Sequence, residues 1–156
     1  MKLNLFELGQ KNEDLRAQLP AFFDIWQSEI DSAEKLFDIK GMRLEGLARD
    51  VPQHQVQYAR RAQEAKALIK WLEVEKGRAE SRYVKNYNTS PRALGSKEQA
   101  QYLLGEKDIV ELNQLIVEAA LKQQQLEEIV DGFRQMGWML QSIVKLRVAE
   151  LQDTVI

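Results

Sequence analysis

Apolar residues recur at intervals of three and four along most of this chain, a spacing typical of helices that pack on one face. After Pro20 the apolar set comprises Phe22, Trp26, Ile30, Ala33 and Phe37. It predicts an amphipathic helix that ends at a bend marked by Gly41 and Gly46. A weaker helix is predicted before Pro20, from about Asn4 to Gln18.

A second long helix is predicted to begin near Asp50 and Pro52, because proline is favoured in the first turn of a helix. Its apolar stripe comprises Tyr58, Ala62, Ala65, Ile69, Leu72, Ala79 and Tyr83. Residues 86–96, NYNTSPRALGS, have the composition of a loop. Ser96 and Gln99 have capping-box spacing, which predicts a short helix that ends near Gly105.

The last third of the chain has a heptad pattern, which predicts a long helix with a coiled-coil-like seam. The seam comprises Ile109, Leu112, Ile116, Ala119, Leu126, Val130, Phe133, Leu140, Val144 and Leu151. A continuous helix over this span is about 65 Å long at about 1.5 Å per residue, too long for a compact monomer. All of these residues except Ala119 and Leu151 are therefore predicted to mediate oligomerisation. Gly132 and Gly137 predict a kink, a close helix crossing or a break.

Charge is unevenly distributed, although the formal net charge is only -2. Between Val51 and Arg92 the chain has nine basic and four acidic residues, whereas the segments on either side are acidic. Tyr58, Trp71, Tyr83 and Tyr87 are interleaved with these cations. A basic stripe with aromatic residues is the combination that a groove for single-stranded nucleic acid requires.

Arg78, Arg82 and Lys85 are spaced i, i+4 and i+7, so they form a ridge on one face of the second long helix. The predicted DNA-binding residues are Lys76, Arg78, Arg82, Tyr83, Lys85, Tyr87 and Arg92. The alternative is a solvated face whose cations pair with Glu75 and Glu80. In that alternative the two tyrosines pack against the helical core.

Catalytic and cofactor-binding motifs are missing from the sequence. It has no cysteine, a single histidine at position 54 and no phosphate-binding glycine loop. We therefore expect no enzyme activity, no metal and no cofactor. Trp26 and Trp138 are expected to fill helix interfaces. No apolar run approaches the roughly 18 residues of a membrane span, and the acidic start does not fit a signal peptide, so a cytoplasmic location is expected.

Two tracts of the C-terminal half are specific in sequence, LLGEKDIVELNQLI at residues 103–116 and EEIVDGFRQMGWMLQSIVKLRVAEL at residues 127–151. Through these tracts the C-terminal half resembles the UvsY-type recombination mediator family of T-even-like bacteriophages. IDSAEKL at residues 30–36 and the segment 51–75 are similar in order and spacing to the N-terminal half of the family. The similarity divides the chain into an N-terminal extension (1–20), a helical region with the basic stripe (21–92) and a C-terminal oligomerisation region (93–156).

This resemblance implies an all-helical, ring-like homo-oligomer, a hexamer or heptamer, in the cytoplasm of an infected bacterial host. Its implied partners are single-stranded DNA, a single-strand-binding protein that it displaces or remodels, and a RecA-like recombinase of the UvsX type that it helps to load. Family members bind DNA partly through a Lys-x-Arg pair shortly before a Tyr-Tyr pair. An alignment without gaps places Ser81 and Tyr83 at the two basic positions, and only Tyr87 retains a tyrosine. The nearby ridge is expected to contact phosphate instead.

Two other functions fit the same sequence pattern. One is a structural coiled-coil scaffold or chaperone, in which the basic stripe pairs with an acidic neighbour. The other is a replication adapter that loads a hexameric helicase and has no DNA-binding role of its own.

Overall fold

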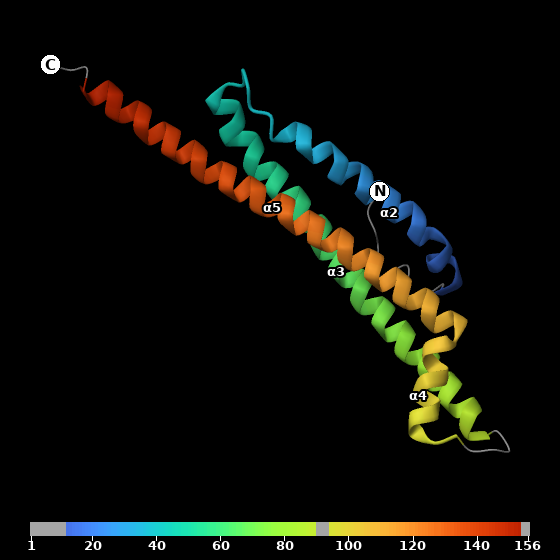
Figure 1. Ribbon diagram of the computed structural model, residues 1–156. Helices are drawn as coiled ribbons and strands as arrows, with labels where there is room; N and C mark the ends of the chain where they lie inside the picture. The colour runs from blue at the N-terminus through green and yellow to red at the C-terminus, as the bar shows by residue number, and fades with distance from the viewer. Residues whose placement is uncertain (1–11, 90–93, 154–156) are drawn as a thin grey trace.

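The protein is a bundle of long helices. The computed structural model describes residues 12–89 and 94–153, and the regular structure in these residues is entirely helical. The helices are α2 (Asn12–Leu36), α3 (Leu44–Thr89), α4 (Ser96–Gly105) and α5 (Lys107–Asp153). Helices α3 and α5 run antiparallel, side by side, and α2 lies along them, while the short α4 crosses at the far end (Figure 1). The predicted all-α fold class is confirmed.

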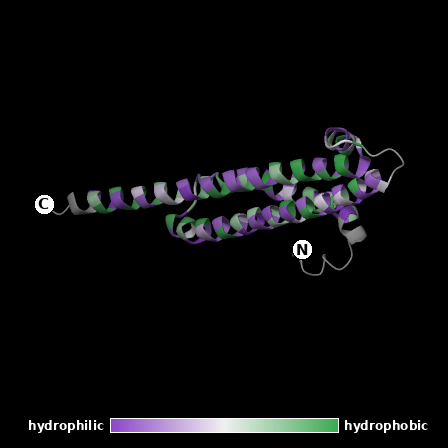
Figure 2. Ribbon diagram, turned by 90° about the horizontal axis from the view of Figure 1, so that it is seen from below, coloured by the Kyte–Doolittle hydropathy of each residue, from purple (hydrophilic) through white to green (hydrophobic). Residues whose placement is uncertain are grey.

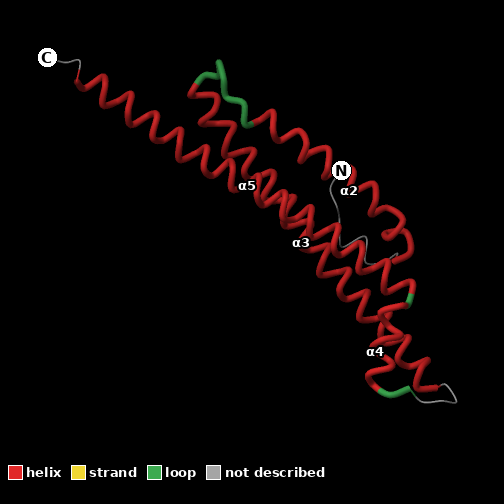
Figure 3. The backbone as a smooth tube through the Cα atoms, viewed as in Figure 1, coloured by secondary structure: helices red, strands yellow, loops and turns green. Residues whose placement is uncertain are grey.

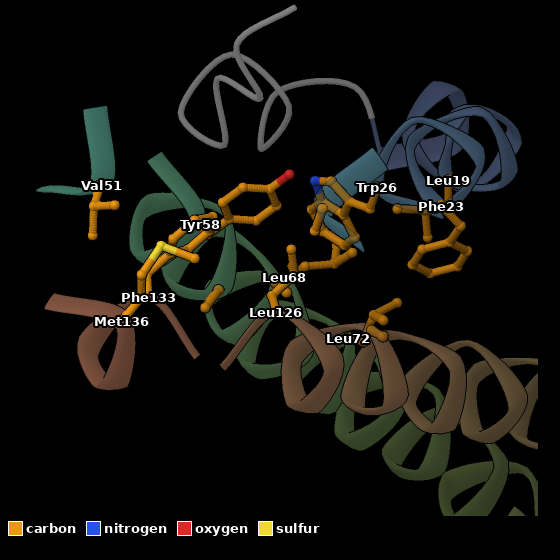
Figure 4. Packing of buried hydrophobic residues seen from close by; sticks show 14 of the residues in the cluster. Leu19, Phe23, Trp26, Val51, Tyr58, Leu68, Leu72, Leu126, Phe133 and Met136 are labelled. Carbon is orange, nitrogen blue, oxygen red and sulfur yellow. The ribbon is translucent and has the colours of Figure 1, made fainter. Parts of the chain in front are cut away.

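The apolar stripes of the three long helices form one continuous core. Tyr58, Leu68 and Leu72 of α3 are buried in the same cluster as Leu126 and Phe133 of α5 (Figure 4). The α2 residues Leu19, Phe23 and Trp26 complete this cluster. Burying a side chain of this size stabilises a fold by about 1.5–3 kcal/mol relative to leaving it exposed. The core therefore arises from the helical periodicity of the sequence.

Helix α2 passes through Pro20 without a break, so the predicted boundary between two helices at this proline is wrong. Leu19 and Phe23, on either side of the proline, are buried in the core. Packing of these side chains offsets the backbone hydrogen bond that proline cannot donate. Leu19 also places part of the predicted extension 1–20 within the core. The beginning of the predicted first helix, at residues 4–11, lies outside the described residues.

The bend between α2 and α3 occurs where the sequence predicted it. Gly41 has a φ of 75°, a left-handed conformation that glycine adopts without steric cost. Helix α3 then begins at Leu44, earlier than the predicted start near Pro52. Leu47 and Val51 are both buried, so the additional turns pack an apolar face. Burial again outweighs a proline signal. The connection from α2 to α3 is a short loop (Figure 3).

The predicted short helix that ends near Gly105 is confirmed as α4, although its cap differs from the predicted one. The Gly95 N–H donates to the Glu98 carboxylate at 3.1 Å, one residue before the expected Ser96–Gln99 box. The Gln99 side-chain amide instead donates to Asn88 Oδ1 at 2.8 Å and to the Leu94 carbonyl at 3.0 Å. Gln99 thereby ties α4 to the end of α3.

Helix α5 is continuous through both of its glycines. A Cβ atom on Gly132 would lie 2.8 Å from the Phe37 ring, so this glycine makes room for the side chain that follows the end of α2. Gly137 has no such neighbour, and neither glycine breaks the helix. The C-terminal end of α5 projects beyond the bend between α2 and α3 (Figure 1).

The heptad seam of α5 is covered mainly by the chain itself. Of the predicted oligomerisation residues, Ile109, Leu112, Leu126, Phe133 and Leu140 are buried in the core of one chain. Ile116 and Val130 are partly buried and pack against the same core. Only Val144 is substantially exposed, at 43%. Helices α3 and α2 thus cover most of the seam. The length of α5 therefore does not require a second copy of the chain to bury these side chains.

Candidate nucleic-acid interface

Helix α3 presents a cationic surface on the side opposite the core. Its exposed cations between residues 51 and 89 are Arg60, Lys66, Lys70, Arg78, Arg82 and Lys85. We call these residues the cationic face. At about 3.6 residues per turn they fall within a sector of roughly 160°, and Arg60 and Lys85 are about 37 Å apart along the helix. Glu73 is the only exposed acidic residue in the same described span.

The other acidic side chains of α3 after Val51 are partly or fully buried. Glu75 is buried and accepts a hydrogen bond from Arg78 at 2.6 Å. Lys76 lies 3.8 Å from Glu80, and both are partly buried. The alternative, in which cations pair with Glu75 and Glu80, therefore holds for Arg78 and Lys76. In contrast, Arg82 and Lys85 form no ion pair within residues 12–89 and 94–153.

Contacts with α2 set the orientation of α3. Arg61 donates to both carboxylate oxygens of Glu29 at 2.8 and 2.9 Å, and also to Glu64 at 2.9 Å. The hydrogen bond to Glu29 is the main cause of the raised pKa of Arg61, which keeps the guanidinium charged. The Tyr58 hydroxyl donates to the Glu29 carbonyl at 2.9 Å, and burial raises the pKa of Tyr58. These contacts direct the cationic face toward solvent.

Three tyrosines cluster where α3, α4 and α5 meet. The ring centroids of Tyr83 and Tyr87 are 6.4 Å apart, and those of Tyr87 and Tyr102 are 6.2 Å apart. Tyr83 packs against the core, and the Tyr87 hydroxyl donates to the Glu106 carboxylate at 2.6 Å. Tyr102 of α4 is 58% exposed. The two predicted stacking residues are thus partly buried, and sequence reasoning missed the exposed member of the cluster.

Tyr87 is expected to ionise at a higher pH than an ordinary tyrosine. Desolvation, followed by the hydrogen bond to Glu106, raises the pKa of Tyr87 to about 12, from an ordinary value of about 10. The folded protein therefore holds this proton more tightly than the unfolded chain. Its stabilising contribution is complete below about pH 10 and is lost as the pH rises toward about 12.

Ultraviolet titration of tyrosinate measures the pH at which Tyr87 ionises. Tyr87→Phe is expected to remove an ionisation step near pH 12, while the control Tyr102→Phe retains it. If the ionisation step near pH 12 is unchanged in Tyr87→Phe, this step does not belong to Tyr87.

The remaining predicted aromatic positions differ in burial. Trp26 is buried, as predicted. Trp138 is 62% exposed, so it does not fill a helix interface within the chain as predicted. Trp71 is partly buried against the core, and His54 stacks on Phe133 with ring centroids 5.5 Å apart. Arg92, the last predicted DNA-binding residue, lies outside the described residues.

The C-terminal part of α5 has several exposed apolar side chains. Met139, Val144, Leu146 and Val148 are all exposed there, and hydrophobic and hydrophilic residues alternate toward the C-terminus (Figure 2). A groove of about 440 Å³ lies next to this segment. It is lined by Leu44, Ala48, Val51, Pro52, Gly137, Leu140, Gln141, Val144 and Lys145.

The fold and this surface define an all-helical protein with a cationic helix face. No protein-family model, no curated protein and no solved structure matches the chain. None of the described helices is long and apolar enough to cross a membrane. Across the described part of the chain, no three histidine or acidic side chains come together as potential metal ligands.

Proposed function

We propose that this protein binds single-stranded DNA through the cationic face of α3 and acts as a recombination mediator. In this role it remodels DNA coated with single-strand-binding protein and promotes loading of a RecA-like recombinase of the UvsX type. One observation supports the binding step above all. Along α3 after Val51, six of the eight cations are exposed, whereas three of the four acidic side chains are partly or fully buried. The resemblance of residues 103–116 and 127–151 to the UvsY-type family supports the recombination role.

Binding through this surface follows from the electrostatics of a phosphate backbone. Each cation that neutralises a phosphate releases a condensed counterion, and for single strands the salt dependence is about -0.7 per contact. Phosphate contacts carry no sequence information, so binding is expected to tolerate any sequence. Fluorescence anisotropy with a labelled oligonucleotide tests the proposal. Lack of binding even at about 50 mM salt, where such contacts are strong, would refute it.

Self-association strengthens such a mediator, because several weak sites held together bind one strand tightly. We place the association surface at the exposed end of α5, where Val144 and Leu146 are 43% and 65% exposed. A hexamer or heptamer is the assembly that the family resemblance implies. The interior seam residues do not contribute to this surface, because the chain covers them.

Replacing Val144 and Leu146 together by glutamate is expected to dissociate the assembly, because charged groups are costly to bury in an apolar interface. Native mass spectrometry measures the change in oligomeric mass. The matched control is Val117→Glu with Leu121→Glu, an exposed apolar pair in the first half of the same helix. An unchanged mass in the first variant, or equal dissociation in the control, would rule out this surface.

The scaffold alternative is favoured by the ion pairs of Arg78 and Lys76, which neutralise part of the surface within the chain. A scaffold is expected to leave labelled DNA unbound at all salt concentrations. A helicase-loading adapter is expected to retain a hexameric helicase rather than a recombinase. Pull-down against both enzymes, performed with the same immobilised protein, distinguishes the adapter from the mediator.

A further inference from the structure

Tyr102 is a large aromatic residue that the fold leaves mostly exposed. It lies on α4, and its side chain is 58% exposed. One neighbour supports it, since the Tyr87 ring lies 6.2 Å away, centroid to centroid. One side of Tyr102 is therefore supported while much of its surface remains available to a ligand.

The elements around this ring hold it in place. The Tyr87 hydroxyl donates to the Glu106 carboxylate, and Tyr83 packs against the core. The Gln99 amide ties α4 to Asn88, near the end of α3. A ring held in this way loses little conformational entropy when a ligand stacks on it.

Cations of the cationic face lie on the same turns of α3 as the tyrosines that support Tyr102. Arg82 precedes Tyr83, and Lys85 lies between Tyr83 and Tyr87. Tyr83 faces the core side of α3, so a strand bound along the cationic face reaches the tyrosine cluster by continuing around the end of this helix.

We propose that Tyr102 stacks on an unpaired base of the strand whose phosphates lie on the cationic face. This inference rests on the proposed function, and it adds a cause for the preference for single strands. Phosphate contacts alone hold duplex and single strand alike. Stacking on an aromatic side chain requires a base whose face is free, which the interior of a duplex does not offer.

The test compares Tyr102→Ala with wild-type protein on a 25-nucleotide oligothymidine and on a blunt duplex of the same length. We expect the affinity for the single strand to fall by roughly 5- to 140-fold, the range for loss of one base–aromatic stack. The affinity for duplex is expected to change by less than about twofold, because its phosphate contacts remain. Tyr102→Phe retains the ring and is expected to bind like wild type. Leu104→Ala changes an exposed apolar residue on the same helix and serves as the matched control.

An abasic strand of the same length separates this inference from the proposed function. Wild type is expected to bind the abasic strand more weakly than oligothymidine, and Tyr102→Ala is expected to bind both alike. If wild type binds no strand at all, the proposed function fails. If wild type binds but Tyr102→Ala matches it on oligothymidine, or loses duplex binding to the same extent, the stacking role is overturned while the DNA-binding function stands.

Discussion

Removing the unpaired cations of the cationic face is expected to weaken single-stranded DNA binding by about three orders of magnitude at about 0.1 M salt. Within the described part of the chain these are Arg60, Lys66, Lys70, Arg82 and Lys85. If each contacts one phosphate, their replacement by alanine makes the slope of log affinity against log salt shallower by about 3.5. Anisotropy titrations at several salt concentrations measure both quantities.

Arg78 is left in place in this variant because it has a structural contact. Its guanidinium pairs with the buried Glu75 carboxylate, so Arg78→Ala would leave a buried charge without its partner. A loss of binding in Arg78→Ala therefore mixes unfolding with lost phosphate contacts. Combining Arg78→Ala with Glu75→Gln removes the stranded charge and isolates the contribution of Arg78 to binding.

The matched control removes the same number of exposed cations from other parts of the molecule. These residues are Lys35, Lys40, Arg43, Arg134 and Lys145. The control has the same net charge as the variant, so it is expected to keep most of the salt slope of wild type. An equal loss in both proteins would mean that only net charge matters. Unchanged binding in the α3 variant would remove the cationic face from the DNA site.

Leu126→Ala is expected to destabilise the fold by about 2–5 kcal/mol, the range for truncating a buried leucine. Leu126 is fully buried in the core formed by α2, α3 and α5 (Figure 4). For a protein of this size the midpoint of thermal unfolding is expected to fall by about 4–20 °C. Leu121→Ala makes the same chemical change five residues earlier on α5, where the side chain is 53% exposed. Its expected cost is below about 1 kcal/mol.

The dependence on protein concentration shows which chain covers the seam. If Leu126 packs within one chain, the difference between variant and wild type is the same in dilute and concentrated protein. If a second copy covers it, the difference grows on dilution, because association contributes to stability by mass action. Circular dichroism melts over about a 50-fold range of concentration test this, and a concentration-dependent difference would contradict the intramolecular core.

The periodicity of apolar residues predicted much of the fold because helix formation depends on local spacing. The core stripe from Tyr58 to Ala79, the short α4 and the bend at Gly41 were all predicted from neighbouring residues. The errors in the predicted helix boundaries occur at Pro20 and Pro52, where a local signal competes with burial. At Pro20 the helix continues because residues on both sides of the proline pack into the core.

The candidate site was predicted only in part. The sequence located the basic segment, and Arg82 and Lys85 remain its exposed, unpaired cations. It gave the pairing of the cations with Glu75 and Glu80 as an alternative, but it did not predict that Glu75 is buried, because that depends on which face of α3 meets α5. Tyr102 was missed since one aromatic residue in a short polar helix has no periodicity.

The sequence alone determined that the chain is helical, where its apolar faces run and which segment carries excess positive charge, because each property depends on residues a few positions apart. Tertiary structure alone decided what those faces meet. It turned the seam of α5 onto α3 and α2, exposed Trp138 and brought Tyr102 next to Tyr87 near the end of α3. Such pairings join residues distant in the chain, so their energies arise only when the helices pack together.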